Sequence, residues 1–180
     1  MLRLFALLVC KLTGWKLINK VPQLKKFVVV GAPHTSNWDG FWSICFVSLH
    51  RIPFKFLIKK DLFFFPLGFI LKALGGLPVD RSKSTSTIDQ CVGFFKNTDH
   101  MVLGVTPEGT RSYNPNWKKG FYHISEKAGV PLVVGYIDYQ EKIMCMDHVF
   151  EKSGNIDQDI ERLKEFYRSK KGRHPELGVI

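Results

Sequence analysis

Residues 26–40, KFVVVGAPHTSNWDG, combine an apolar run, a turn and the start of a helix. The run at 26–31 is rich in β-branched residues and ends at a glycine, which predicts a buried strand. Residues 37–50 are predicted to be helical. A buried strand that leads through a short turn into a helix is the basic unit of an α/β domain with a parallel sheet.

The same alternation of strands and helices continues along the chain. Further strands are expected at 54–58, 77–80, 101–105, 131–139 and 142–150, and the last two are candidates for a hairpin. Helices are expected at 63–76, 85–97, 120–129 and 156–170. Residues 106–119 read as a long loop. The 180 residues, 45% of them hydrophobic, suit one domain with a substantial core. We therefore predict a single α/β domain whose largely parallel central sheet is flanked by helices.

The N-terminal segment, residues 1–20, is expected to contain an amphipathic helix over residues 2–15. Its apolar face would carry Leu4, Leu7, Leu8, Leu12 and Trp15. Two interpretations remain open: a helix that lies in a membrane interface, or one that packs on the core of the protein. No apolar run reaches the roughly 18 residues of a membrane span.

The net charge of +10 is concentrated near the N-terminus. Residues 1–60 hold ten lysines and arginines and a single acid, Asp39. Such a basic region suits a membrane surface, a phosphorylated substrate or a nucleic acid, although a merely solvated basic face is the simpler alternative. Because no nucleic-acid recognition motif is present, we do not expect nucleic acid as a partner.

The cysteines Cys10, Cys45, Cys91 and Cys145 are widely spaced and form no Cys-x-x-Cys pair. This pattern favours reduced, buried thiols in a cytosolic protein over a disulfide framework or a zinc site.

His34 and Asp39 are the first candidates for catalysis. Within a continuous helix their side chains would point about 140° apart, so that only a turn before the helix could bring them together. Ser36 is predicted as the N-cap, which makes Asp39 the third helical residue of a capping box. Asp39 could be no more than a cap, but a capping carboxylate can also orient a preceding imidazole to act as a base.

No nucleophile completes this pair, because Ser112 lacks a Gly-x-Ser-x-Gly setting. We therefore favour direct activation of a substrate hydroxyl by His34, without an acyl-enzyme.

The stretch TPEGTRS, residues 106–112, is a candidate phosphate site. Backbone groups at Gly109, the Thr110 hydroxyl and the Arg111 guanidinium could hold a phosphate, although Glu108 and Arg111 could simply pair in a polar turn. Arg81 follows another predicted strand and is either a second phosphate ligand or the ion-pair partner of Asp80. These residues could converge because sites in open α/β sheets form at the carboxyl ends of strands.

Four ordered blocks resemble those of the glycerolipid acyltransferase family, which includes the 1-acylglycerol-3-phosphate O-acyltransferases. The blocks are HTSNWD (34–39), GLPVDR (76–81), PEGTRS (107–112) and VPLV (130–133). The His-x4-Asp pattern alone is weak, but in order with the Pro-Glu-Gly-Thr-Arg block it is specific. Residues 21–180 would form the acyltransferase domain.

This resemblance implies transfer of a fatty acyl group from acyl-coenzyme A or acyl carrier protein to the hydroxyl of a lysophospholipid. His34 would be the general base and Asp39 its orienting partner. Binding of the acceptor phosphate and shaping of the site would fall to Arg81, Glu108, Gly109, Thr110 and Arg111. No bound cofactor or metal is expected, and the protein would be cytoplasmic, peripherally associated with an anionic membrane surface at the inner face of the membrane.

Two other functions fit the same sequence. A thioesterase would use water in place of the acceptor, and a non-catalytic lipid-binding module would use only the charge and the apolar stretch Phe63–Leu74. That stretch could line an acyl groove, dip into a bilayer or be plain core.

Overall fold

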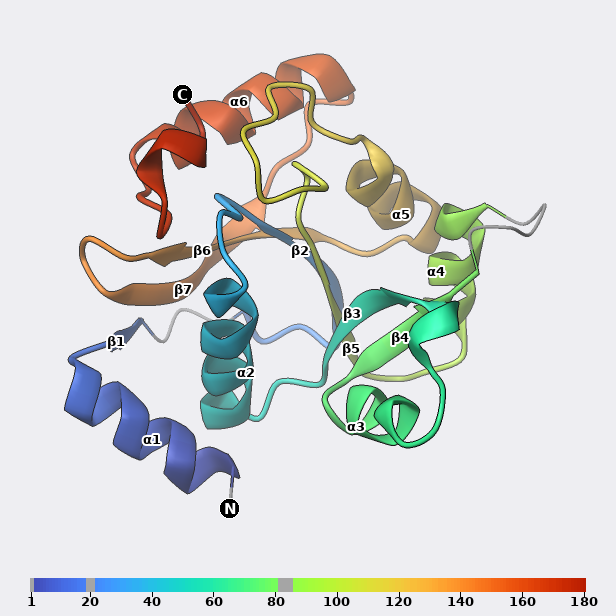
Figure 1. Ribbon diagram of the computed structural model, residues 1–180. Helices are drawn as coiled ribbons and strands as arrows, with labels where there is room; N and C mark the ends of the chain where they lie inside the picture. Colours follow the sequence, from blue (N-terminus) through green and yellow to red (C-terminus); the bar gives the residue numbers. More distant parts are fainter. Residues whose placement is uncertain (1, 19–21, 81–85) are drawn as a thin grey trace.

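Strand β2 (Lys26–Gly31) lies near the centre of the molecule (Figure 1). The computed structural model describes residues 2–18, 22–80 and 86–180, and within them seven strands form one sheet in the order β1-β7-β6-β2-β5-β3-β4. Residues 27–30 of β2 are at most 6% exposed. The strand is therefore covered on both faces, as its β-branched run predicts.

The other strands, in chain order, are β1 (Lys16–Ile18), β3 (Phe54–Lys59), β4 (Gly76–Val79), β5 (Met101–Val105), β6 (Leu132–Asp138) and β7 (Ile143–Phe150). Strands β6, β2, β5, β3 and β4 are mutually parallel. Strand β7 returns antiparallel to β6 as the predicted hairpin, and β1 pairs in parallel with β7 at the edge. The prediction of a largely parallel α/β sheet is confirmed.

Helices cover both faces of the sheet (Figure 1). They are α1 (Leu2–Thr13), α2 (Trp38–His50), α3 (Leu67–Ala73), α4 (Thr87–Lys96), α5 (Gly120–Ala128) and α6 (Ile156–Arg168), with short 3₁₀ turns η1 (Lys60–Leu62) and η2 (Pro175–Leu177). One buried apolar cluster joins α1 and α2 to the sheet, and a second joins α4, α5 and α6 to it. Burial of these two clusters is the main term that stabilises the fold.

Strand β1 is not among the strands predicted from the sequence, and helix α3 is shorter than predicted. Strand β1 has only three residues, too few to show an alternating pattern of apolar and polar residues. Its backbone pairing with residues 143–145 of β7 holds it in the sheet. The helix expected over 63–76 covers only Leu67–Ala73. Pro66, which has no N–H, precedes the first helical residue, and Gly76 belongs to β4.

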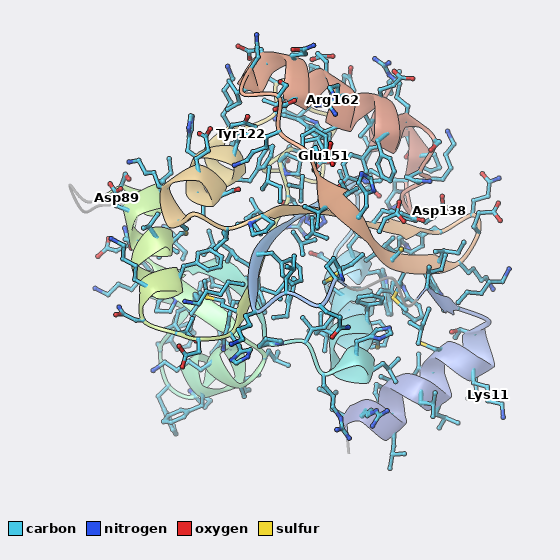
Figure 2. The ribbon with its side chains drawn as sticks, turned by 180° about the vertical axis from the view of Figure 1, so that it is seen from behind. Lys11, Asp89, Tyr122, Asp138, Glu151 and Arg162 are labelled. Carbon is cyan, nitrogen blue, oxygen red and sulfur yellow. The ribbon has the colours of Figure 1, made fainter. Side chains whose placement is uncertain are left out.

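Helix α1 packs on α2 through small side chains and leaves its large ones outside. Ala6 and Cys10 are buried, whereas Leu4 is 72% and Leu12 76% exposed. The helix therefore contacts the core and also presents an apolar face to its surroundings. Figure 2 shows Lys11 pointing away from the molecule on the same helix.

The stretch 63–74 is not plain core. Phe64, Phe65, Phe69 and Ile70 are all more than half exposed, and Phe65 reaches 82%.

The four cysteines are buried and free, as predicted.

Candidate active site

The carboxyl ends of three neighbouring strands meet at one edge of the sheet. Val30 near the end of β2 pairs with Val105 of β5 and with Val134 of β6, so the segments that follow these strands start side by side. This is the edge at which open α/β sheets bind ligands. The His34 turn follows β2, and the Pro-Glu-Gly-Thr-Arg segment follows β5.

His34 and Asp39 are in contact. His34 Nδ1 lies 2.9 Å from Asp39 Oδ2, across the turn that joins β2 to α2. The His34 side chain is 26% exposed, and within residues 2–18, 22–80 and 86–180 no group bonds to its Nε2. With Nδ1 donating to the carboxylate, Nε2 carries a lone pair that can accept a proton.

Asp39 is a buried carboxylate with four donors. Its Oδ2 also accepts from the backbone N–H groups of Thr35 and Ser36, each at 3.0 Å, and its Oδ1 accepts from the Tyr139 hydroxyl at 2.7 Å. Burial alone raises the pKa of Asp39, but the hydrogen bonds from His34, Tyr139 and Ser36 outweigh it, so the pKa lies below its usual value. Asp39 therefore stays ionised beside the imidazole.

The helix start differs by one residue from the expected capping box. Asn37 occupies the N-cap position, but its side chain does not cap the helix. A tight turn, in which Asp39 N donates to Ser36 O at 3.3 Å, precedes the regular helix at Trp38. Ser36 Oγ accepts from Trp38 N, at 3.2 Å, instead of from Asp39 N. The reciprocal bond from Ser36 N to the Asp39 carboxylate is nevertheless formed, so this carboxylate both caps the helix and holds His34.

Tyr139 is a site residue that sequence reasoning missed. It directly follows β6, and burial, together with the Asp39 carboxylate, raises the pKa of its hydroxyl. Its ring packs edge-on against Trp15, with 5.2 Å between ring centroids, which ties the segment after α1 to the site. The one sequence feature that could have indicated a site role for Tyr139 is its position at the carboxyl end of a predicted strand, where sites in open α/β sheets form.

Replacing Tyr139 with Phe is expected to lower the free energy of unfolding at pH 7 by about 1.5–3 kcal/mol, the usual worth of a hydrogen bond to a charged group. The lowered pKa of Asp39 means that this stability is present above the unfolded-state pKa of about 3.9 and is lost as the pH falls through the folded value. Urea unfolding at pH 7 and pH 3 measures both effects.

Tyr113→Phe, in an exposed loop, is the matched control and should unfold like the wild type. An equal cost for Tyr139→Phe at both pH values would contradict the assigned bond.

Glu108 supports the His34 turn from β5. Its Oε1 accepts from the backbone N–H of His34 at 3.0 Å, and its side chain is buried. Burial raises the pKa of this carboxyl above its usual value. Glu108 and Arg111 therefore have different partners, and the simple ion pair considered from the sequence is not what the turn contains.

The rest of this segment faces the start of α2. Arg111 Nη1 donates to Asn37 Oδ1, which brings the guanidinium beside the helix that follows His34. Gly109 has φ +66°, a left-handed conformation that favours glycine, and the Lys118 side chain lies over it. Thr110 is exposed and accepts from Ser112 N at 3.3 Å. Arg81 lies outside the described residues.

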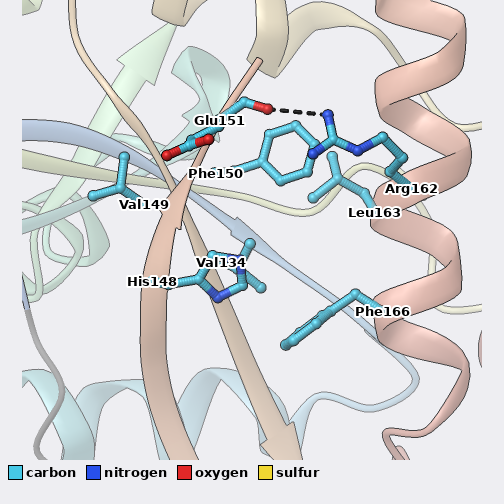
Figure 3. Close-up of a pocket in the computed structure, with 8 residues that line it drawn as sticks. All are labelled: Val134, His148, Val149, Phe150, Glu151, Arg162, Leu163 and Phe166. Carbon is cyan, nitrogen blue, oxygen red and sulfur yellow. Dashed lines mark hydrogen bonds between the residues drawn. The ribbon is translucent and has the colours of Figure 1, made fainter. Parts of the chain in front are cut away.

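A cavity of about 350 Å³ lies elsewhere, between β7 and α6 (Figure 3). It borders His148 and Phe150, and Phe150 pairs with Leu132 at the beginning of β6. The cavity also borders Val134, but none of its eight lining residues belongs to the His34 turn or to the segment after β5. Arg162 at its rim bonds the carbonyl of Glu151 and the carboxylate of Asp159.

Comparisons with known proteins concern the family and the fold. The family model described as Acyltransferase matches residues 16–137. Among solved structures, the crystal structure of the 1-acyl-sn-glycerophosphate (LPA) acyltransferase PlsC from Thermotoga maritima is similar, with a TM-score of 0.60 and 18% sequence identity. The match covers 92% of this chain and 76% of that chain, and at this identity it concerns the fold. No curated protein matches the sequence.

Proposed function

The chain belongs to the acyltransferase family, and from this premise we propose that it transfers a fatty acyl group to the hydroxyl of a lysophospholipid such as 1-acylglycerol-3-phosphate. The donor is acyl-coenzyme A or acyl carrier protein. The observation that carries the proposal is the 2.9 Å contact between His34 Nδ1 and Asp39 Oδ2, which leaves Nε2 without a hydrogen-bond partner among the described residues. Arg111 bonds Asn37, three residues after His34.

In this mechanism His34 acts as the general base. Its Nε2 removes the proton of the acceptor hydroxyl while the hydroxyl oxygen attacks the thioester carbonyl, and the buried Asp39 carboxylate stabilises the imidazolium that forms. Collapse of the tetrahedral intermediate forms the ester and breaks the bond to sulfur. The imidazolium then returns its proton to the departing thiolate.

The acceptor phosphate is proposed to bind the segment after β5. Arg111 offers a planar, permanently charged donor pair that suits phosphate oxygens, and Gly109 and Thr110 lie beside it in the turn. Glu108, which is buried and bonded to His34 N, shapes the turn instead of touching the ligand. Arg81 remains a proposed phosphate ligand on the resemblance alone.

Thiol release from acyl-coenzyme A, measured with and without lysophospholipid, tests the reaction. Acyl transfer requires release that depends on the acceptor, together with a diacyl product of the expected mass. Release of equal rate without acceptor would identify a thioesterase instead, and vesicle binding without any release would identify a lipid-binding module.

Arg111→Ala is expected to raise the acceptor KM by about tenfold or more, because a charge-assisted phosphate contact is lost, with a smaller effect on kcat. Steady-state kinetics with varied lysophosphatidate measure this. Arg168→Ala removes an exposed arginine that pairs with Glu165 on α6 and should behave as wild type. An unchanged acceptor KM in Arg111→Ala would remove Arg111 from the phosphate site.

We also propose that the protein docks on anionic membranes. Every helix in residues 2–18, 22–80 and 86–180 is too short or too polar to cross a bilayer. Helices α1 and α3 lie on either side of α2 (Figure 1). Each region carries exposed apolar side chains: Leu4, Phe5, Leu7, Leu8 and Leu12 on α1, and Phe64, Phe65, Phe69 and Ile70 in and before α3. Exposed apolar area of this kind marks interaction sites, and nearby lysines such as Lys11 and Lys72 favour anionic lipid.

The double variant Phe65→Ser/Phe69→Ser should weaken binding to vesicles with anionic phospholipid by on the order of tenfold or more, since each buried Phe contributes about 1.5–3 kcal/mol. Vesicle sedimentation measures the change, with Val149→Ser on β7 as the exposed-apolar control. Equal binding by the double variant and the control would show that the α3 surface does not touch lipid.

A further inference from the structure

The C-terminal segment, residues 171–178, packs on the His34 turn. His174 N donates to Thr35 Oγ1 at 3.2 Å, and the carbonyl of Lys171 accepts from Tyr139 N at 2.8 Å. At Gly172 an added Cβ would lie 2.6 Å from Thr35 Oγ1, so the backbone approaches the turn as closely as only glycine permits. The segment is thus held beside the residues that bond Asp39.

This packing brings a second arginine to the start of α2. The Arg173 guanidinium carbon lies 5.5 Å from the centroid of the Trp38 ring, and Trp38 is the first residue of the helix. Arg111 bonds Asn37, the preceding residue. Burial raises the pKa of the Tyr139 hydroxyl, and the positive charge of Arg173 opposes this rise.

Both arginines remain without a neutralising carboxylate. On α6, by contrast, Arg162 and Arg168 form ion pairs with Asp159 and Glu165. Across the described ranges, no carboxylate oxygen lies within 4.0 Å of the Arg111 or Arg173 guanidinium. Both side chains are exposed. An exposed guanidinium supported by an aromatic ring keeps its in-plane N–H donors available to an incoming anion.

We propose that Arg173 binds a phosphate group of a substrate at this site and so helps to determine which substrates are accepted. The inference rests on the proposed function, in which both substrates carry phosphate: the acceptor in its headgroup and the donor in coenzyme A or in phosphopantetheine. Planar N–H donors suit phosphate oxygens, and the cation–π contact with Trp38 restrains the guanidinium in advance of binding.

The test compares Arg173→Ala and Arg173→Lys with Arg168→Ala, the control from the end of α6. In Arg173→Ala, the KM for either lysophosphatidate or acyl-coenzyme A should rise by about tenfold or more, while kcat stays within about threefold. The substrate whose KM rises identifies the phosphate. Arg173→Lys, which keeps the charge, should recover part of the loss, and Arg168→Ala should match the wild type.

Two outcomes would overturn the proposal. One is an unchanged KM for both substrates in Arg173→Ala. The other is a lower kcat and a lower melting temperature with unchanged KM values, because these would indicate a purely structural role for the contact with Trp38.

Calorimetry separates this inference from the proposed reaction. Coenzyme A, lysophosphatidate and the phosphate-free monoacylglycerol are titrated into wild type and Arg173→Ala. If the wild type transfers no acyl group, the proposed function fails, but weaker binding of one phosphate-bearing ligand by the variant still supports Arg173. Equal affinities of wild type and variant for coenzyme A and for lysophosphatidate would exclude the role.

Discussion

Replacing His34 with alanine is expected to reduce kcat of acyl transfer by at least roughly 10²–10⁴-fold, the usual contribution of a general base. The variant loses Nε2, which is the proposed proton acceptor, and the segments that directly follow β2, β5 and β6 contain no other histidine. His174, in the C-terminal segment after α6, lies with its Nδ1 3.7 Å from Glu176 Oε1. Quenched-flow or steady-state measurement of thiol release with acceptor present gives the change.

The fold should survive this substitution. The backbone N–H of His34 donates to Glu108, and the alanine variant keeps that bond. The Asp39 carboxylate also keeps its bonds from Thr35, Ser36 and Tyr139. Circular dichroism and a melting curve serve as controls, and His148→Ala, on the far end of β7, should be fully active. A folded His34→Ala protein with near wild-type turnover would remove His34 from the mechanism.

Asp39→Asn should have the second largest effect, a fall in kcat on the order of 10²-fold or more. The amide oxygen can still accept at the Oδ2 position, and the amide nitrogen can donate to the Tyr139 oxygen. What disappears is the negative charge that stabilises the imidazolium formed in the transition state. The acceptor KM should change little, because Asp39 is buried away from the proposed ligands.

Steady-state kinetics of Asp39→Asn beside Asp61→Asn test this expectation. Asp61 is an exposed carboxylate that pairs with Lys59, so its variant controls for a change of net charge. If Asp39→Asn and Asp61→Asn turned over equally fast, Asp39 would be a helix cap without a catalytic role.

Local sequence pattern accounts well for the framework of this protein. A strand buried on both faces needs a continuous apolar run, and the β-branched run 26–31 therefore predicted β2. The turn after it is short enough for His34 to reach Asp39 in the first turn of α2. The helix predicted over 120–129 agrees within one residue with α5, which ends at Ala128 and is capped by Gly129 in the left-handed conformation. These features depend on residues that are neighbours in sequence.

Contacts between distant residues were beyond the sequence analysis. Tyr139 bonds a carboxylate 100 positions earlier in the chain, and His174 bonds Thr35 across 139 positions. Neither spacing repeats with a helical or strand period, so only the folded sheet reveals the pairing. The same holds for β1, whose three residues depend on β7.

The most direct test of the His34–Asp39 pair is a double-mutant cycle on kcat/KM for acyl transfer, with wild type, His34→Ala, Asp39→Asn and the combined variant. Residues that act as one unit are strongly non-additive. If Asp39 works only through His34, the combined variant will retain the residual rate of His34→Ala within about threefold. If the two losses instead multiply, the two side chains act independently and the proposed pair does not exist as a catalytic unit.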